Sequence, residues 1–424
     1  MNTTAPAAVR AGTSADAILG ALPKEVFSPS TVEEAAAVLE EKARTSASVG
    51  FVGGGTALGL GRPPRRLDAV IRTEHLARIV EHAPSDQIIV VEAGITLAEL
   101  QRAVGAHRQR LALDPPLPER TTIGGLVATN GFGARRTRYG SLRDLIIGVS
   151  LVRADGVPAK GGGKVVKNVA GFDLPKMMVG SLGTLGLVAT VTFRLHPLPD
   201  SDMTLVARER TARGVRELAS AMRGAQLEPA AVAALLQGQR FDVAIRFEGF
   251  PAGVAEQRDR LQQLVGQAPG SACDVLSEAE ARALWERHDA LRTAGPLRAK
   301  VAFLPAALEA LAEGPLARLM DALGGPSFVL YPTLGLGFVA GLPGDAALVV
   351  QAVETVRGSL AGTGGSLVLE EAPDDVRAHA DPWGPPPASF ASPLPRRVRR
   401  RPRSSTSRDA RSGAGRPTAF RPDR

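Results

Sequence analysis

Three adjacent glycines in the stretch VGFVGGGTALGLG, residues 49–61, constrain this chain more than any other feature. Glycine loses the most conformational freedom on folding, so a run of glycines in an ordered protein needs a structural reason. Pro63 and Pro64 follow shortly afterwards and would end any helix that began here. The stretch is therefore either a plain loop after a strand or a bare backbone turn that approaches an anionic ligand closely.

Two familiar phosphate-binding loops do not match this chain. A P-loop has Ser or Thr after its Gly-Lys pair, whereas Val165 follows Gly163-Lys164. A nicotinamide-type fold needs GxGxxG at the start of a helix and an acidic residue about 20 positions later. Glu74 has that distance, but the glycine spacing is wrong and the prolines interrupt the helix. The remaining ligand interpretation is a loop that holds a flavin dinucleotide without a helix behind it.

Such a loop needs other bare backbone segments that converge on the same long ligand, and the sequence contains two. Residues 115–133, PPLPERTTIGGLVATNGFG, combine an extended proline entry with threonine hydroxyls and several glycines. Residues 171–190, GFDLPKMMVGSLGTLGLVAT, carry glycines three positions apart before a strand. Taken alone, each segment is more often a turn or a packing point than a binding site.

The pattern of apolar residues predicts an α+β fold, mixed α/β, in two parts. Residues 24–197 alternate strand-like runs with helices, one of them capped by Ser30 or Thr31. Residues 198–385 follow a stiff HPLP junction and again alternate strand and helix. This second pattern predicts an antiparallel sheet covered by helices on one side, a cap or substrate domain.

Both ends of the chain are predicted to be disordered. Residues 1–23 lack the apolar core of a signal peptide and are expected to form a leader. Residues 386–424 are rich in Arg and Pro, and 11 arginines with two aspartates lie within 396–424. The net charge of +8 therefore belongs to the tail, because the remaining chain has 40 basic and 41 acidic residues. The tail lacks helical periodicity and interleaved aromatic residues, which favours disorder over nucleic-acid binding.

The cysteine and histidine content limits the possible redox chemistry. Cys273 is the single cysteine, which excludes an internal disulfide and a Cys-ligated zinc or iron–sulfur site. The histidines show no metal-ligand spacing, so no metal site is predicted. No apolar run reaches 18 residues, so no transmembrane segment is predicted. Electron transfer would therefore need an organic cofactor or a metal in a partner.

The chain resembles the FAD-binding (PCMH-type) domain of the vanillyl-alcohol oxidase and p-cresol methylhydroxylase superfamily. The resemblance rests on ordered motifs: GFVGGGTALG, PPLPERTTIGG, NGFGARRTRYGSLRDLIIGVSLVRADG, KVVKNVAGFDLPKMMVGSLGTLG and a closing strand. Within them, KNVAGFDLPKMMVGSLGTLG is similar to the corresponding stretch of the GlcE family of glycolate oxidase subunits. The resemblance covers about residues 24–197 and extends more loosely to about 385.

The resemblance implies an FAD site whose contacts run from the pyrophosphate to the flavin end and the adenine. The implied contacts are Gly53, Gly54, Gly55, Thr56, Thr121, Thr122, Gly124, Gly125, Gly131, Gly133, Gly183 and the backbone of Val188. Relatives with covalent flavin often have a histidine after the glycine run, whereas this chain has Thr56, so the FAD is expected to be non-covalent. The candidate cations for the reduced flavin are Arg135, Arg136, Arg138, Arg143, Lys164 and Lys167.

Oxidation of a hydroxy acid needs a cation for the carboxylate and a base for the hydroxyl. The segment WERHDALR supplies Arg287 and His288, the catalytic candidates, on an expected helix. The resemblance implies a glycolate oxidase complex in which a second FAD subunit and an iron–sulfur subunit are partners and glycolate becomes glyoxylate. A cytoplasmic protein at the inner face of the membrane through its complex is then expected. The alternatives are a dehydrogenase for lactate or another 2-hydroxy acid, and a flavin-holding assembly subunit without turnover.

The C-terminal sequence departs from the pattern that the resemblance implies. Relatives end with a segment resembling FDPxGxLNPGRF that returns to the flavin domain, whereas this chain continues from DPWGPPP into the arginine-rich tail. We interpret this departure as an altered reading frame. Loss of the return segment is expected to weaken FAD retention or assembly.

Overall fold

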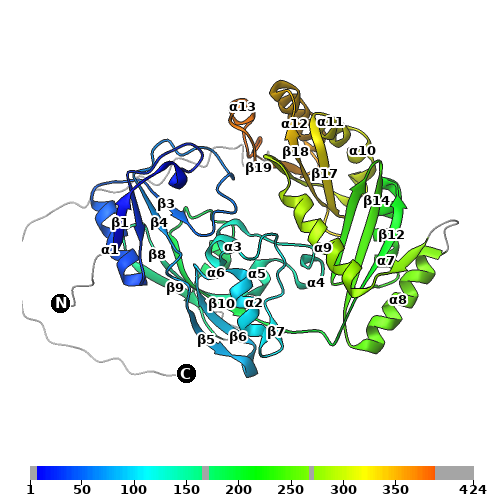
Figure 1. Ribbon diagram of the computed structural model, residues 1–424, viewed down its shortest axis with the longest axis horizontal. Helices are drawn as coiled ribbons and strands as arrows, with labels where there is room; N and C mark the ends of the chain where they lie inside the picture. The colour runs from blue at the N-terminus through cyan, green and yellow to red at the C-terminus, as the bar shows by residue number, and fades with distance from the viewer. Residues whose placement is uncertain (1–6, 165–170, 267–271, 387–424) are drawn as a thin grey trace, which may run out of the picture. The chain divides into compact units, whose positions relative to one another are not determined.

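A computed structural model describes residues 7–164, 171–266 and 272–386 of the chain (Figure 1). Met1–Pro385 cluster into one compact unit, and Pro386–Arg424 are a separate unit. The predicted disordered tail and altered reading frame lie outside the described residues, apart from Pro386. Both therefore stay predictions.

The first sheet has four strands in the order β1-β2-β4-β3. Its strands are β1 (Ala8–Ala11), β2 (Glu25–Ser28), β4 (Ala69–Arg72) and β3 (Val49–Val52). β2 and β3 both run parallel to β4, whereas β1 is antiparallel to β2. Helix α1 (Val32–Arg44) packs on this sheet. Thr31, one of the two residues predicted to cap it, precedes the helix, and its hydroxyl accepts a hydrogen bond from the Glu34 amide.

The prediction of a disordered leader is wrong for residues 7–23. Ala8 to Ala11 pair with Ser28 to Glu25 as an edge strand. Asp16 is buried, and its carboxylate accepts hydrogen bonds from the Arg10 guanidinium at 2.6 and 2.7 Å and from the Thr13 amide at 3.0 Å. A backbone ladder and the ion pair on the buried Asp16 order this segment, with apolar contacts from only a few residues, Ala7, Ile18 and Ala21, so a hydrophobic pattern misses it. Residues 1–6 lie outside the described part.

The second sheet has five antiparallel strands in the order β5-β6-β10-β8-β9. They are β5 (Ile79–Ala83), β6 (Ile88–Glu92), β10 (Leu187–Arg194), β8 (Ile146–Val152) and β9 (Pro158–Gly162). The helices of this region are α2 (Leu97–Gly105), α3 (Ile123–Thr129), α4 (Arg136–Tyr139), α5 (Leu142–Leu145) and α6 (Leu174–Met178). Helix α3 packs against β10 in a shared apolar core, which fixes the start of α3 beside the first sheet's loops.

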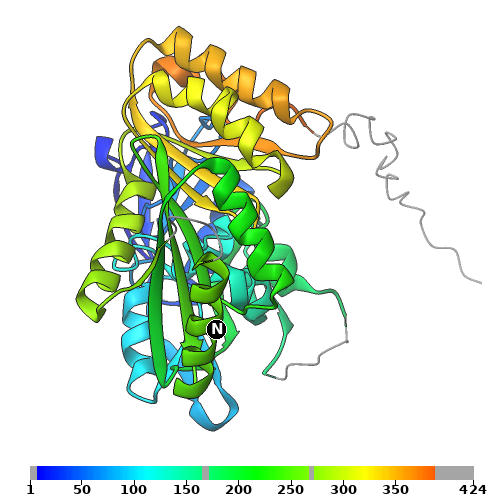
Figure 2. The same cartoon turned by 90° about the vertical axis from the view of Figure 1, so that its right-hand side faces the viewer.

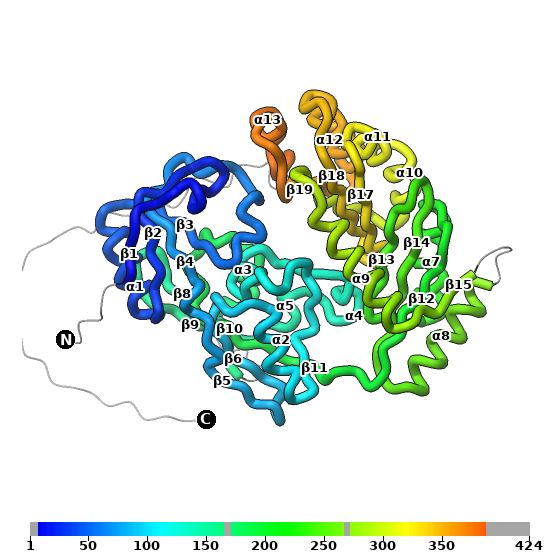
Figure 3. The backbone as a smooth tube through the Cα atoms, in the orientation of Figure 1, coloured from blue at the N-terminus to red at the C-terminus, as the bar shows by residue number. Residues whose placement is uncertain are grey.

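After β10 the chain forms the short strand β11 (His196–Pro197), which pairs with the earlier β7 (Gln109–Arg110). It then enters the third sheet (Figure 3). This sheet has eight antiparallel strands in the order β15-β12-β14-β13-β17-β18-β16-β19. They are β12 (Ser201–Arg210), β13 (Ala231–Gln237), β14 (Arg240–Gly249), β15 (Cys273–Val275), β16 (Leu297–Ala302), β17 (Leu323–Tyr331), β18 (Leu336–Pro343) and β19 (Ser366–Glu371). The predicted domain boundary at 197/198 falls between β11 and β12 and itself stays a prediction.

Most helices of this part pack on one face of the eight-stranded sheet, as Figure 2 shows from their side. They are α7 (Ala212–Gly224), α8 (Pro251–Gly266), α10 (Leu308–Glu313), α11 (Pro315–Asp321) and α12 (Ala346–Leu360), while the short α13 (Asp374–Arg377) follows β19. Helix α9 (Glu278–Thr293) lies on the opposite face of the sheet. The prediction that helices cover only one side is therefore wrong for α9.

The period of two along β13 explains the two faces. Val232 and Ala234 point into the core beneath the helices, whereas Ala231 and Ala233 join Phe132 in a second apolar cluster. The second face is therefore covered by α9 and by a loop of the N-terminal part. The mixed first sheet and the antiparallel remainder confirm the predicted α+β class.

Candidate FAD site

Three segments far apart in the sequence line one cavity of about 540 Å³. They are the glycine-rich loop after β3, the start of α3 and the stretch that leads into β10. Nine of the twelve residues predicted to contact FAD line it: Gly53, Gly54, Gly55, Thr56, Thr122, Gly124, Gly125, Gly183 and Val188. The structure brings these nine together, while their contact with FAD stays a prediction.

The loop after β3 has backbone donors to offer. Within the described part of the chain, none of the amides of Gly53–Thr56 donates a hydrogen bond. The close approach also explains the glycines, because a Cβ on Gly54 would overlap the Arg120 carbonyl oxygen and one on Gly53 would overlap the Thr122 hydroxyl. Adjacent free amides beside bare backbone are suited to a diphosphate, whose charge strengthens each N–H···O bond.

The start of α3 contributes surface rather than donors. The Gly124 amide donates to the Ala93 carbonyl at 2.7 Å, and the Gly125 amide donates to the Thr122 hydroxyl at 3.3 Å. Thr121 does not line the cavity. Its hydroxyl donates to the Pro116 carbonyl, and its amide donates to the Leu117 carbonyl. The prediction that Thr121 supplies donors to this cradle is therefore wrong, because local turn geometry consumes both.

Two buried polar atoms at the other end of α3 lack partners. Asn130 ends the helix with φ 53°, and its Oδ1 has no hydrogen-bond partner among the described residues. The same holds for the Ser181 hydroxyl on the neighbouring segment, which hydrogen-bonds to α3 through its flanking amides. An unsatisfied buried polar group costs about 1–3 kcal/mol, but neither residue lines the cavity, so these two atoms do not identify its ligand.

Gly131 and Gly133, predicted to lie at the flavin end, do not line the cavity. Gly133 packs against the backbone of Asp114, where a Cβ would overlap the carbonyl oxygen. The Asp114 carboxylate accepts the Arg135 amide at 3.0 Å, and burial raises the pKa of Asp114. These contacts fix the loop on which Phe132 meets the eight-stranded sheet.

Of the two catalytic candidates on α9, one is buried and the other is exposed. His288 is buried, and its Nε2 lies 2.9 Å from the Tyr331 hydroxyl while its Nδ1 lies 2.9 Å from Asp289 Oδ1. Arg287 is exposed. The pair therefore does not form one site. The cation that joins His288 is Arg292, whose Nη1 donates to the Tyr331 hydroxyl at 3.0 Å. The sequence contained a signal for this, because His288 and Arg292 are four positions apart and such residues lie on the same face of a helix.

A buried ion cluster around Glu248 joins the N-terminal part to the eight-stranded sheet. Arg110 donates to its carboxylate at 2.5 and 3.0 Å, and Arg135 donates at 2.9 Å. Burial raises the pKa of Glu248, but the Arg110 hydrogen bond and the charges of Arg135, Arg110 and Arg246 outweigh it and hold the pKa at about 2. Sequence reasoning missed this cluster because Glu248 is one acid among many on a strand.

Most of the predicted flavin cations have other partners. Arg135 and Arg138 both donate to Glu248, and Lys164 pairs with Glu81. Arg136 lies over the Phe132 ring, 4.4 Å from its centroid. Arg143 is exposed, and Lys167 lies outside the described residues.

The segment after β19 contacts the glycine-rich loop. Arg62 forms an ion pair with Asp381, and Arg377 donates to the Gly61 carbonyl at 3.2 Å. Trp383 packs against Gly61, where a Cβ would lie 3.4 Å from its ring. Residues 377–383 thus contact the glycine-rich loop, whereas the expected loss of the later return segment concerns residues outside the described part and stays a prediction.

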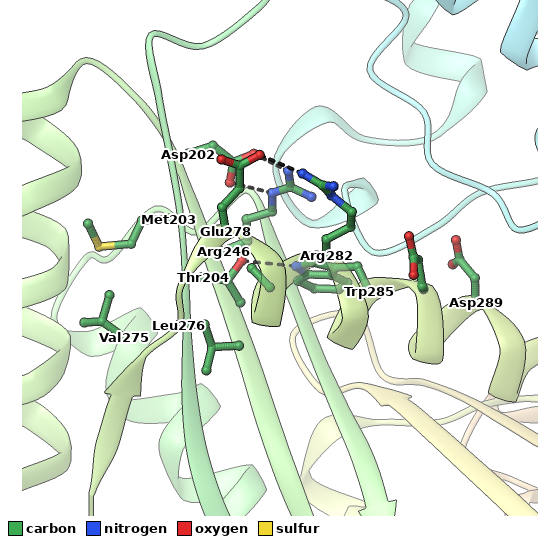
Figure 4. A pocket seen from close by; sticks show the side chains of 12 residues that line it. Asp202, Met203, Thr204, Arg246, Val275, Leu276, Glu278, Arg282, Trp285 and Asp289 are labelled. Carbon is green, nitrogen blue, oxygen red and sulfur yellow. Dashed lines mark hydrogen bonds and ion pairs between the residues drawn. The ribbon is translucent and has the colours of Figure 1, made fainter.

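A second cavity, of about 620 Å³, lies between β12, β14 and α9 (Figure 4). Arg246 pairs with Asp202, Arg282 pairs with Glu278, and the Trp285 indole donates to the Thr204 hydroxyl at 3.1 Å. Glu286 and Asp289 also line this cavity, so acidic side chains outnumber the two arginines and the lining suits an anionic ligand less well than the first cavity does.

Comparison with known proteins identifies the cofactor. A family model described as an FAD binding domain matches residues 23–160. Residues 23–160 are thus similar to FAD-binding domains, and this match supports FAD as the cofactor. The glycine-rich loop and α3 of this segment are the parts that line the cavity of about 540 Å³.

Several curated proteins are similar to a little under half of this chain. Glycolate oxidase subunit GlcE of Escherichia coli K12 is 33% identical over 213 residues, which are 49% of this chain and 58% of that protein. The GlcD subunit of Bacillus subtilis is 31% identical over 49% of this chain and 44% of that protein. A D-lactate dehydrogenase of Archaeoglobus fulgidus is 37% identical over 43% of this chain and 40% of that protein. The chain therefore spans about half the length of the relatives it matches.

Solved structures extend the fold likeness beyond residues 23–160. p-Cresol methylhydroxylase with substrate bound has a TM-score of 0.66 at 13% identity and covers 83% of this chain and 82% of its own. An alkyldihydroxyacetonephosphate synthase also has a TM-score of 0.66, at 16% identity, covering 81% and 72%. The fold is that of these flavoproteins, and the likeness says nothing further of substrate.

The described residues contain neither a candidate metal site nor a candidate membrane-spanning helix. No group of three or more His, Cys, Asp or Glu side chains is placed to hold a metal ion there. Among the helices of the described part, none combines the length and apolar character that crossing a bilayer requires.

Proposed function

We propose that this chain is the FAD-binding subunit of a glycolate oxidase-type complex and oxidises a small 2-hydroxy acid, glycolate, to the 2-oxo acid. One observation carries the proposal: four adjacent free amides after β3 open into a cavity that two other glycine-containing segments complete. Similarity to GlcE and GlcD supports the choice of glycolate.

In this proposal the amides of Gly53–Thr56 bind the pyrophosphate, and Gly124 and Gly125 let it lie close to α3. Gly183 and the Val188 backbone lie at the adenine end. When bound, FAD supplies the two-electron acceptor for the oxidation. Thr56 offers no nucleophilic ring nitrogen, so we expect the cofactor to be non-covalent.

The partners follow from what the chain lacks within its described part. No metal group there is placed to accept electrons, so we propose that an iron–sulfur subunit receives them and that a second FAD subunit completes the complex. A cytoplasmic location, at the membrane's inner face through the complex, is part of the same proposal.

A dehydrogenase for lactate is the second candidate, favoured by the similarity to the Archaeoglobus fulgidus enzyme. A flavin-holding assembly subunit without turnover is the third. These three functions differ in how the bound flavin responds to substrate.

The test is purification of the full chain followed by anaerobic addition of glycolate and, separately, D- and L-lactate. We expect yellow protein whose visible flavin band bleaches with glycolate, and acid precipitation that releases the flavin into the supernatant. Bleaching by lactate alone would favour the second candidate, and yellow protein that never bleaches would favour the third. Colourless protein that added FAD does not turn yellow would contradict all three.

A further inference from the structure

Arg292 differs from the other arginines where the N-terminal part meets the eight-stranded sheet. Arg110, Arg135 and Arg246 all form ion pairs with Glu248. Arg292 forms no ion pair with a carboxylate among residues 7–164, 171–266 and 272–386, and its Nε–H is buried without a hydrogen-bond partner. An unpaired buried donor on a cation is unfavourable unless a ligand completes it.

The guanidinium of Arg292 is nevertheless held firmly on one side. Its Nη1 donates to the Phe132 carbonyl at 2.8 Å and to the Tyr331 hydroxyl at 3.0 Å. Its charge lies 3.9 Å from the centroid of the Phe338 ring and within 6 Å of the Phe132 and Tyr331 rings. Aromatic rings in place of water strengthen any electrostatic interaction that this cation makes.

A buried hydrogen-bond chain orients the tyrosine that holds Arg292. Because a carboxylate only accepts, His288 donates from Nδ1 to Asp289, and its Nε2 then faces the Tyr331 hydroxyl. Burial raises the pKa of Tyr331, so its hydroxyl stays protonated and can donate to the ring nitrogen. Asp289, His288 and Tyr331 thus fix Nη1 of the guanidinium and leave Nε without a hydrogen-bond partner.

The edge without a hydrogen-bond partner in the described chain is the one that Nε shares with Nη2, because both bonds use Nη1. This chain uses the same edge to bind carboxylates elsewhere: Arg246 holds Asp202 and Arg62 holds Asp381 through Nε and Nη2, with one donor to each carboxylate oxygen. Two parallel N–H donors match the two oxygens of a carboxylate.

We propose that Arg292 binds the carboxylate of a small organic acid through its Nε–Nη2 edge, with Tyr331 and His288 as positioning residues. The identity of that acid as a 2-hydroxy acid rests on the proposed function. Phe132, which contacts Arg292, lies between the two glycines predicted to flank the flavin end. Arg292, rather than Arg287, is then the cation that the reaction requires.

The test uses the purified full chain with FAD and titrates sodium acetate while the visible flavin band is recorded. Acetate has the carboxylate but no hydroxyl to oxidise, so its binding does not depend on turnover. We expect a saturable change with acetate and none with acetamide at the same concentrations. A flavin band that acetate leaves unchanged would overturn the proposal without any variant.

Variants then assign the binding to Arg292. Arg292→Lys keeps the charge but removes the paired donors, and Arg292→Gln removes both, so we expect acetate affinity to fall at least tenfold in each while FAD stays bound. Guanidinium ion added to Arg292→Ala should restore part of the affinity. Arg282→Gln is the matched control, since Arg282 lies on the same helix, is 65% exposed and pairs with Glu278. Acetate affinity within twofold of the unmodified protein in Arg292→Gln would overturn the proposal.

The two proposals fail in different ways. Glycolate that does not bleach the flavin, with acetate still binding through Arg292, would contradict the proposed function alone. Glycolate that bleaches the flavin equally fast and with the same KM in Arg292→Lys would contradict the role of Arg292 alone.

Discussion

The glycine-rich loop after β3 and the cluster around Glu248 are both polar, both partly enclosed and both built from segments distant in the sequence. They differ in whether their polar groups already have hydrogen-bond partners within the protein. Every oxygen of the Glu248 carboxylate is occupied by arginine or tyrosine donors, whereas the amides of Gly53–Thr56 have no acceptor in the described chain. The first arrangement holds two parts of the fold together, and the second is prepared for a ligand.

This difference separates effects on stability from effects on FAD binding. A substitution in the Glu248 cluster should lower the free energy of unfolding and leave FAD affinity nearly unchanged in the folded protein. A substitution in the glycine-rich loop should do the reverse. Each region is therefore the control for the other.

The largest expected effect is on stability. Glu248→Gln removes the ion-pair partner of the buried Arg110 and leaves Asp114 as the carboxylate near Arg135, and removing one partner of a buried pair costs about 3–5 kcal/mol. Denaturant unfolding should show this loss. Glu217→Gln is the matched control, because Glu217 is 55% exposed and pairs with Arg213 on one helix, which is worth about 0.3–0.5 kcal/mol. Equal destabilisation by the two variants would contradict the assigned role of Glu248.

Acid should sharpen that measurement. The pKa of Glu248 is held at about 2, below the ordinary glutamate value of about 4.3, so its carboxylate stabilises the fold fully above the ordinary value. The stabilisation is lost as pH falls from about 4.3 through about 2. We therefore expect the difference in unfolding free energy between Glu248→Gln and the unmodified protein to be constant near pH 6–7 and to shrink below pH 4. A difference that grows with acid would contradict this sign.

The second effect is on FAD affinity. A methyl group on Gly54 would overlap the Arg120 carbonyl, and both are backbone positions that cannot rotate away. Gly54→Ala should therefore displace the loop and weaken FAD binding by at least about 100-fold, roughly 2.7 kcal/mol. FAD titration followed by flavin fluorescence measures the change. Gly253→Ala is the matched control, because that helical glycine has no heavy atom within 4 Å of an added Cβ. FAD binding by Gly54→Ala at unmodified strength would contradict the assignment of the loop.

The sequence predicted features that depend on local rules. Thr31 caps α1, Gly54 marks a close backbone approach, and the ordered glycine motifs indicated the segments that line the cavity. It failed where an outcome depends on contacts between distant residues. The hydroxyl of Thr121 donates to the Pro116 carbonyl, and Arg292 rather than Arg287 shares the Tyr331 hydroxyl with His288, because helix phase and tertiary packing decide both. The order of residues 7–23 likewise depends on β2, which no local pattern reveals.

The smallest expected effect is at the contact between the glycine-rich loop and the segment after β19. Asp381→Asn removes the ion pair with Arg62, whose side chain is 69% exposed, and exposed pairs are worth about 0.2–1 kcal/mol. Arg377 and Trp383 still hold Gly61, so FAD affinity should fall less than about fivefold. FAD titration with Asp345→Asn, on a helix cap of α12, as the control measures this change. A loss as large as that of Gly54→Ala would mean that residues 371–384 are part of the cofactor site. The site would then have to be defined as the glycine-rich loop together with this segment.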